Sequence, residues 1–360
     1  MGYLILIIVI GGLLVVGFPA LKNKLFYSGI FVSKEIFTLN DKIKLVPPED
    51  IFERRVEVFK QIDNLAKNSV SGNGFSSNIY SFVKVRLDQP LKEISQTQVP
   101  KGKVKIWYIY NMGIIAKSAD ATIAFDLAGT YVYSDMPNFA KYIDILVISH
   151  FDNDHFDLSV VKQALKDGVI VIVPGDKISF NGQQFGRDPN GEDAVSLIKK
   201  RNGINSNNLI SLSPQEKTTI KGVEITAYPS NHIHDTDKED SFINPPVNWY
   251  SINLSGITLL HMGDGSSFNY QPDFTKKNID VFITHSTALD PRTNDDLMKT
   301  VPNAEIILPL HVLELGHGPD AVNCCQNYQS ILDNYANGYY KSQSGKTIFM
   351  PMIWGESLLF

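Results

Sequence analysis

The distribution of hydrophobic residues divides the chain into three parts. A continuous apolar run covers residues 3–20, an amphipathic stretch covers residues 47–70, and short β-branched runs separated by turns follow after Pro100. These three patterns are typical of a membrane segment, a surface helix and buried strands. We therefore expect a membrane anchor, a helical lead-in and a sheet-rich main body, in that order.

The N-terminal run has the composition of a membrane helix. Residues 3–20 carry no charged side chain, and their number reaches the lower limit for crossing a bilayer. We predict an anchor over residues 1–24. Lys22, Lys24 and Lys34 follow the run, so the positive-inside rule predicts a single-pass protein whose main body lies in the cytoplasm. A cleaved signal peptide and a buried core helix are the alternatives.

Residues 25–100 are predicted to be a helical lead-in to the main body. Residues 47–70 begin with Pro and acidic residues and then place Val56, Phe59 and Ile62 at helical spacing. One amphipathic helix fits this pattern, and a polar stretch rich in Ser, Gly and Asn follows it.

The main body, residues 101–360, is predicted to be a mixed α/β domain. A helix is expected over residues 158–166. Strands with interspersed helices and several hairpin-length gaps favour more than one sheet. Strands are predicted at residues 104–110, 121–127, 144–150, 169–174, 223–229, 249–254, 257–263, 280–285 and 304–311.

Composition and charge exclude several classes of protein. Hydrophobic residues make up 43% and charged residues 20% of 360 residues, which excludes collagen-like, coiled-coil and disordered chains. The formal net charge of −5 provides no general basic field, which disfavours nucleic acid as a partner. Cys324 and Cys325 are adjacent, so they offer neither a long-range disulfide nor a metal-finger spacing.

The histidines are concentrated in one part of the chain. All eight lie between residues 150 and 317. Several follow predicted strands, and loops that leave strand ends usually hold functional sites. The histidines in these positions are His150, His232, His285 and His311.

The densest group of possible ligands is the segment SHFDNDHFD. It contains His150, Asp152, Asp154, His155 and Asp157. Imidazole and carboxylate groups on one tight turn can converge on one or two divalent ions. A solvated acidic turn beside a structural histidine is the alternative, but so many polar groups directly after a buried strand would be costly without a cation.

The order of these motifs resembles the metallo-β-lactamase superfamily. The family signature HxHxDH stands here as HFDNDH, with Asp152 in the place of the second histidine. Residues 107–129 resemble the opening hairpin of the family. The remaining family motifs follow in order over about residues 100–355: SNH with His232, HMGDG with Asp264, and LPLH with His311.

The resemblance implies an α/β (α+β) fold, a four-layer αββα sandwich that holds two divalent metal ions at one edge between the sheets. A metal-bridging hydroxide would then hydrolyse an ester, lactone, amide or phosphodiester. Asp154 would also take part in catalysis, and His285 would donate a proton or support a ligand. The implied ligands are His150, Asp152 and His232 for one metal, Asp154, His155 and His311 for the other, and Asp264 as a bridge.

The aspartate at position 152 changes the expected metal preference. A carboxylate is a harder ligand than imidazole, so zinc is the first expectation but manganese or iron should be better tolerated. The flavodiiron proteins of the superfamily carry Glu at the corresponding place. A redox role like theirs is disfavoured, because no counterpart of their flavin domain follows His311.

Supporting roles are expected for several further residues. Asp126, at the strand end in the opening hairpin, and Asp157 are expected to orient a metal-bound histidine. His261 is expected to support its strand as a partly buried polar residue. Trp249 and Tyr250 are expected in the sandwich core.

Within the superfamily, the DHFD and PLH motifs look most like the branch of ascorbate-6-phosphate lactonase and the phospholipase D that hydrolyses N-acylphosphatidylethanolamine. With the apolar N-terminus, this resemblance suggests a membrane-tethered metal-dependent hydrolase that acts on a small-molecule or lipid substrate. A phosphodiester is the first candidate substrate and a lactone or other ester the second. The alternative is a non-catalytic metal-binding or partner-binding module on the same fold.

Overall fold

The computed structural model describes a defined part of the chain. The predicted anchor over residues 1–24 lies outside the described residues and stays a prediction. None of the helices within the described ranges has the length and apolar character that a bilayer span needs. The described residues are 26–27, 30–31, 33–48, 52–72, 74–175, 178–180, 183–185, 194–230, 247–265, 274, 277–289, 301, 303–318, 327–337 and 347–360.

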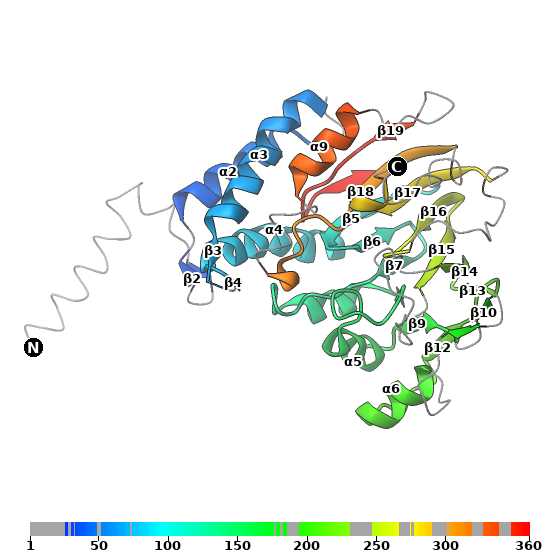
Figure 1. Ribbon diagram of the computed structural model, residues 1–360. Coiled ribbons are helices and arrows are strands. Elements are labelled where there is room, and N and C mark those ends of the chain that lie inside the picture. The colour runs from blue at the N-terminus through cyan, green and yellow to red at the C-terminus, as the bar shows by residue number, and fades with distance from the viewer. Residues whose placement is uncertain are drawn as a thin grey trace, which may run out of the picture.

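Two sheets of seven strands each form the centre of the described structure (Figure 1). The first sheet contains β5 (Lys105–Tyr110), β6 (Gly113–Lys117), β7 (Thr122–Phe125), β8 (Ile145–Val147), β9 (Ile170–Pro174), β12 (Leu209–Leu212) and β20 (Ser357–Leu359). Its order is β12-β9-β8-β7-β6-β5-β20. Strands β20 to β7 pair antiparallel and β7 to β12 pair parallel.

The second sheet has the same division into antiparallel and parallel halves. It contains β13 (Lys217–Ile220), β14 (Val223–Ser230), β15 (Val247–Leu254), β16 (Ile257–His261), β17 (Ile279–His285), β18 (Ala304–Leu310) and β19 (Ile348–Phe349), in that order. Strands β13 to β16 are antiparallel and β16 to β19 are parallel. Every strand predicted from the hydrophobic runs is confirmed.

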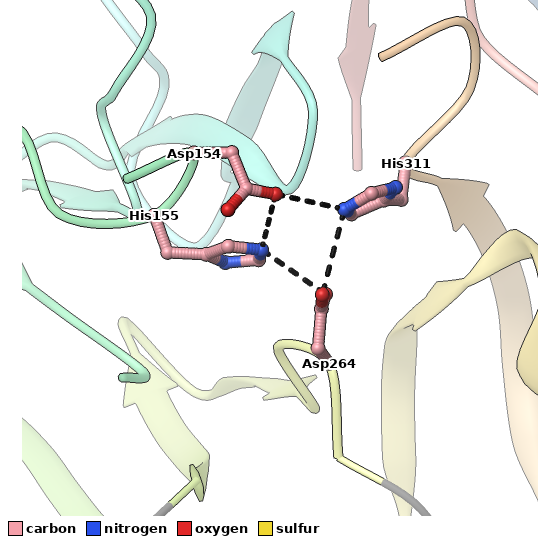
Figure 2. Close-up of side chains that lie close together, drawn as sticks. All are labelled: Asp154, His155, Asp264 and His311. Atoms are coloured by element: carbon pink, nitrogen blue, oxygen red, sulfur yellow. Dashed lines mark hydrogen bonds and ion pairs between the residues drawn. The ribbon is translucent and has the colours of Figure 1, made fainter. Parts of the chain in front are cut away.

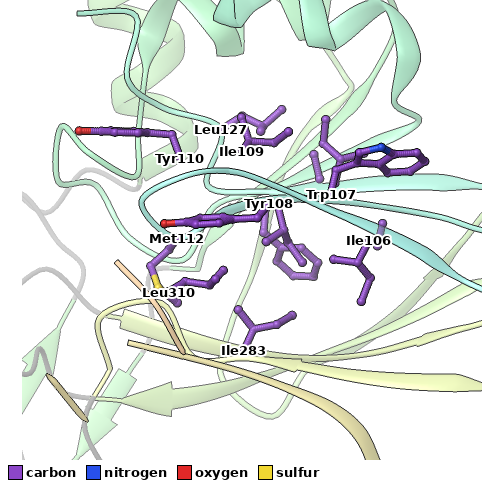
Figure 3. Packing of buried hydrophobic residues seen from close by; sticks show 14 of the residues in the cluster. Ile106, Trp107, Tyr108, Ile109, Tyr110, Met112, Leu127, Ile283 and Leu310 are labelled. Atoms are coloured by element: carbon purple, nitrogen blue, oxygen red, sulfur yellow. The ribbon is translucent and has the colours of Figure 1, made fainter. Parts of the chain in front are cut away.

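The β5–β6 hairpin lies between the second sheet and a layer of helices. Figure 3 shows Ile106 on the side of Ile283 and Leu310 from the second sheet, whereas Ile109 points to the other side. All four side chains are buried. Because both faces of the strand are covered, its sequence is a continuous apolar run instead of an alternating one.

Helices cover the outer face of the first sheet. In the described residues α4 packs on β5 and on the 3-10 helix η2, α5 packs on η2 and β9, and α6 packs on β9 and β12. The predicted helices are confirmed as α3 and α5. The helices are α2 (Lys34–Lys44), α3 (Phe52–Asn68), α4 (Ser77–Gln96), α5 (Leu158–Lys166), α6 (Ala194–Asn202) and α9 (Tyr328–Ala336), with 3-10 helices η2 (Met136–Tyr142), η5 (Ser286–Leu289) and η6 (Leu315–His317).

Three short hairpins complete the described elements. They pair β1 (Phe26–Tyr27) with β2 (Ile30–Phe31), β3 (Val70–Ser71) with β4 (Gly74–Phe75), and β10 (Ile178–Phe180) with β11 (Gln183–Phe185).

Buried charged groups attach the helical lead-in to the main body. Arg55 of α3 donates a hydrogen bond of 2.6 Å to the Glu356 carboxylate, and both side chains are buried. Arg86 of α4 donates to the backbone oxygen of Trp354 at 2.7 Å. Buried charges are tolerated only when they are paired or hydrogen-bonded, so these contacts fix the helices on the sandwich, and both regions share one hydrophobic core.

Asp157 has a different role from the one expected. Its carboxylate caps α5 by accepting hydrogen bonds from Ser159 N at 3.0 Å, and it also accepts from Thr130 N at 3.0 Å. It bonds to no histidine among the described residues. The expectation that Asp157 orients a metal-bound histidine is therefore wrong, and its function in the fold is to start the helix.

The topology places chemically active side chains at one edge of the sandwich. Parallel strands have their carboxyl ends at the same edge of a sheet, and functional loops gather there. Asp126 directly follows β7, Asp264 follows β16 at a distance of three residues, and His311 directly follows β18. His285 ends β17. The site is built from these loop ends.

Candidate metal centre

Four buried side chains from three loops converge at this edge. They are Asp154 and His155 from the loop after β8, Asp264 from the loop after β16, and His311 from the end of β18. Each offers one ligand atom, and these atoms all lie within 4.8 Å of one another. Figure 2 shows the four side chains pointing toward one another. We refer to these four residues as the Asp/His cluster.

Carboxylates and imidazoles alternate around the Asp/His cluster. His155 Nε2 lies 3.2 Å from Asp154 Oδ2 and 3.1 Å from Asp264 Oδ1. His311 Nε2 lies 3.1 Å from Asp154 Oδ2 and 3.5 Å from Asp264 Oδ2. Both histidines therefore direct the same ring nitrogen at the space between the two carboxylates, the arrangement that a divalent ion requires of N and O ligands.

The charged groups of the Asp/His cluster shift one another's pKa values. Burial disfavours the protonated ring of His155, but the nearby charges of Asp264 and Asp154 outweigh it and raise its pKa well above the ordinary value. The pKa of His311 is raised for the same reasons. Burial also disfavours ionised Asp264, yet the charges of His155 and His311 hold the pKa of Asp264 well below its ordinary range. Without a metal, the two carboxylates thus favour the protonated forms of His155 and His311.

A glycine allows the loop after β16 to reach the Asp/His cluster. Gly263, directly before Asp264, has a φ of 53°, a conformation that glycine adopts at little cost. A Cβ atom at this position would lie 2.5 Å from Ser149 Oγ. The glycine in the HMGDG motif therefore permits close contact between the loops that carry Asp264 and His155.

Asp126 fixes the orientation of His155, as the sequence predicted. Its buried carboxylate accepts hydrogen bonds from His155 Nδ1 at 2.9 Å, Ser149 N at 2.7 Å and Ser149 Oγ at 2.6 Å. The Nδ1 proton of His155 is thereby held at Asp126, and Nε2 faces the Asp/His cluster. Such a carboxylate partner commonly sets the tautomer of a metal-ligating histidine.

The other predicted ligands are only partly placed by the described residues. His150 is buried, and its ring centroid lies 4.0 Å from that of His155. His150 Nε2 is 3.4 Å from Asp152 Oδ2, and the Asp152 side chain is 45% exposed. His232 lies outside the described residues. His150 and Asp152 are thus beside the Asp/His cluster, and their binding of a first metal with His232 stays a prediction.

His285 packs against the ring of His311. The two ring centroids are 4.1 Å apart, and His285 is buried. His285 Nδ1 accepts hydrogen bonds from Thr287 N at 3.1 Å and from Thr287 Oγ1 at 2.8 Å. The ring proton of neutral His285 is consequently on Nε2. This position fits the predicted role as a proton donor or a support for a ligand, and that role stays a prediction.

His261 is structural, as expected, but more deeply buried than predicted. Its Nε2 donates to the backbone oxygen of Met112 at 2.9 Å, and its Nδ1 accepts from Gly263 N at 3.2 Å. The ring stacks on Phe125 with a centroid distance of 4.6 Å. Burial lowers the pKa of His261, in agreement with a neutral ring that donates at one nitrogen and accepts at the other. Trp249 and Tyr250 lie in the core, as expected.

Two residues around the Asp/His cluster, Asn111 and Ser149, were not predicted from the sequence. Asn111, in the turn between β5 and β6, donates from Nδ2 to Asp154 Oδ2 at 2.9 Å. Ser149 contacts Asp126 and lies 2.9 Å from His150 Nδ1. Ser149 was recognisable as the residue before the HFDNDH motif, whereas Asn111 in the sequence YNMG suggested only a turn.

The fold is a mixed α/β sandwich of two sheets with a candidate metal site at one edge. Comparisons with known proteins identify its family. The family model described as Beta-lactamase superfamily domain matches residues 106–311. This match spans more than half of the 360-residue chain. The chain belongs to the β-lactamase superfamily, and the Asp/His cluster fits the metal site of this metal-dependent family.

Several solved structures are similar to this chain. The diiron β-hydroxylase CmlA from Streptomyces venezuelae has a TM-score of 0.50 at 14% identity, over 73% of this chain and 54% of that chain. The metallo hydrolase Igni18 from Ignicoccus hospitalis has a TM-score of 0.48 at 15% identity, over 72% of this chain and 98% of that chain. The isothiocyanate hydrolase from Delia radicum gut bacteria has a TM-score of 0.49 at 14% identity, over 71% of this chain and 99% of that chain.

At 14% identity the likeness to CmlA concerns the fold. No curated protein matches the sequence significantly.

Proposed function

We propose that this protein is a membrane-tethered hydrolase that uses two divalent metal ions, with phosphodiesters as its first substrate class and lactones or other esters as its second. The observation that carries the proposal is the Asp/His cluster, in which two buried carboxylates and two buried imidazoles bring their ligand atoms within 4.8 Å of one another. Such a group is costly to bury unless a cation or protons compensate the carboxylates.

The residues present fit a metal ion. His155 Nε2 is buried and makes no hydrogen bond of normal geometry among the described residues, although it lies between Asp154 and Asp264. Its other nitrogen is held by Asp126. A ring nitrogen that is buried, oriented from behind and directed between two carboxylates has the environment of a metal ligand.

The proposed ligand sets follow the sequence motif. One ion would be held by Asp154, His155 and His311, a second by His150, Asp152 and His232, with Asp264 between them. Zinc is the first candidate metal. Manganese and iron are further candidates because Asp152 supplies a hard oxygen ligand where the family signature has imidazole.

The protein's own groups have distinct roles in the proposed reaction. Bound divalent ions would polarise the attacked group and lower the pKa of a water molecule. Asp126 keeps His155 in one tautomer and orientation. His285 is the proposed proton donor, and because its Nδ1 accepts from Thr287, the proton that it gives must leave from Nε2.

The substrate class is inferred from the sequence motifs. The DHFD and PLH motifs resemble a branch of the family that acts on phosphate-bearing substrates, and the apolar run over residues 3–20 favours a substrate in or near a membrane. A fold does not determine a substrate, so the test compares a phosphodiester with a lactone. If neither is hydrolysed although metal is bound, the non-catalytic binding module is the better account.

The full chain in detergent should be assayed with bis-p-nitrophenyl phosphate and with a simple lactone, with zinc, manganese or iron added. Asp154→Ala and His155→Ala should each abolish hydrolysis, because each removes a ligand of the Asp/His cluster. Asp157→Asn is the matched control, since Asn also caps helices and Asp157 contacts no histidine of the described chain. Full activity in either alanine variant would contradict the assignment.

A further inference from the structure

Asn111 connects two residues of the Asp/His cluster that come from different sheets. Its side-chain Nδ2 donates to Asp154 Oδ2 at 2.9 Å. Its backbone oxygen accepts a hydrogen bond from His311 N at 3.0 Å. Asp154 follows β8 of the first sheet and His311 follows β18 of the second. Asn111 is fully buried, so both bonds are shielded from water and correspondingly strong.

The hydrogen bond from Asn111 is accepted by the same Asp154 oxygen that faces both histidines of the Asp/His cluster. Asp154 Oδ2 is the oxygen that lies 3.2 Å from His155 Nε2 and 3.1 Å from His311 Nε2. A donor on this oxygen limits rotation of the carboxylate. Because the amide is neutral, it stabilises the negative carboxylate without placing a competing positive charge beside a metal ion, as a lysine or arginine would.

The backbone at this position also restricts the residue. Asn111 has a φ of 53°, in the left-handed region that Gly, Asn and Asp adopt more readily than other residues. Gly has no donor, and Asp would place a second carboxylate against Asp154. Asn is therefore the residue that combines this turn conformation with a neutral hydrogen-bond donor.

The rest of the turn holds the neighbouring loops. The backbone oxygen of Met112 accepts from His261 Nε2 at 2.9 Å, and His261 ends β16, three residues before Asp264. The hydroxyl of Tyr110, the last residue of β5, accepts from Leu315 N at 2.7 Å, at the start of η6 and four residues after His311. The end of β5 and the β5–β6 turn thus hydrogen-bond to the segments that carry the four residues of the Asp/His cluster.

We propose that Asn111 is a positioning residue of the metal centre, which sets metal affinity by fixing the Asp154 carboxylate relative to His311. This inference rests on the proposed metal-dependent function. It adds a determinant from the β5–β6 turn, outside the motifs that supply the ligands. Partners that orient metal ligands typically contribute about 10–100-fold to metal affinity.

The test uses Asn111→Gly, which keeps the left-handed backbone and the carbonyl that accepts from His311 N, and removes only the side-chain amide. The control is Ser255→Gly, because Ser255 also has a positive φ, 55°, in the hairpin turn between β15 and β16. Full-length metal-free wild type and both variants are titrated with zinc and with manganese against a chromophoric chelator. Circular dichroism establishes that each protein is folded.

Asn111→Gly should bind metal about 10–100-fold more weakly than wild type, and Ser255→Gly should bind as wild type does. Wild-type affinity in folded Asn111→Gly would overturn the inference while leaving the proposed function intact. An equal loss of affinity in Ser255→Gly would also overturn it, because the effect would then belong to turn flexibility. A wild-type protein that binds neither metal would contradict both the proposed function and this inference.

Discussion

The substitution Asp126→Asn should damage the metal centre without removing a ligand. In the native protein the Asp126 carboxylate accepts from Ser149 N, Ser149 Oγ and His155 Nδ1 at 2.7, 2.6 and 2.9 Å. Asn has the same shape but a single acceptor oxygen. If that oxygen keeps the bond to Ser149 N, the amide NH2 group faces His155 Nδ1. The ring must then accept at Nδ1 and carry its proton on Nε2, the nitrogen that faces the Asp/His cluster.

The expected magnitude follows from this change of tautomer. Loss of a charged hydrogen bond to His155 destabilises the fold by about 1.5–3 kcal/mol. Loss of the orienting partner of a ligand weakens metal binding by about 10–100-fold, which corresponds to about 1.4–2.7 kcal/mol of binding free energy. Metal affinity and unfolding free energy should therefore fall by similar amounts.

The assay is a metal titration of the folded, metal-free protein, with urea unfolding of the same samples. Asp157→Asn is the matched control: it makes the same charge change, but the Asp157 carboxylate bonds to Ser159 and Thr130. It should leave metal affinity unchanged. Native metal affinity in Asp126→Asn would refute the view that Asp126 sets the His155 tautomer.

Three further predictions concern metal choice, pH and stability. Asp152→His should shift metal preference toward zinc in competition titrations, and an unchanged preference would show that Asp152 is not a ligand. The raised pKa values of His155 and His311 stabilise the metal-free fold fully below the ordinary value of 6.5, and this contribution is lost as pH rises through the raised values. Metal must displace these protons, so affinity should increase with pH; a flat pH profile would argue against protonated histidines. Arg55→Met leaves the Glu356 carboxylate buried without the Arg55 guanidinium and should lower the unfolding free energy by about 3–5 kcal/mol in urea titrations. Unchanged stability would show that the ion pair does not contribute to the stability of the fold.

The sequence predicted the strands best where both faces of a strand are buried. β8 is buried at every position and β17 at all but one, and the continuous apolar runs of such strands are easily recognised. β13 (Lys217–Ile220) is half exposed at a sheet edge and has no such run. α4 contains Pro90, a residue that usually ends a helix pattern, and the sequence pattern did not predict this helix.

The Asp/His cluster was predictable because its residues lie in motifs that follow apolar strands. Asp154 and His155 are adjacent, and Asp264 and His311 each follow a strand end. The contact between Asn111 and Asp154 joins residues 43 positions apart. No local pattern marks this contact, because an asparagine in a hairpin turn is sufficiently explained by the turn itself. Only the packing of the two sheets brings the turn to the carboxylate.

Whether the protein is a metal-dependent hydrolase is best decided by measuring metal content and turnover on one sample. The full chain, purified in detergent without chelator, should be analysed for zinc, manganese and iron and then assayed with bis-p-nitrophenyl phosphate. We expect about two ions per chain, as in two-metal hydrolases, and turnover that disappears with chelator and returns with metal. No bound metal and no turnover with any added divalent ion would contradict it.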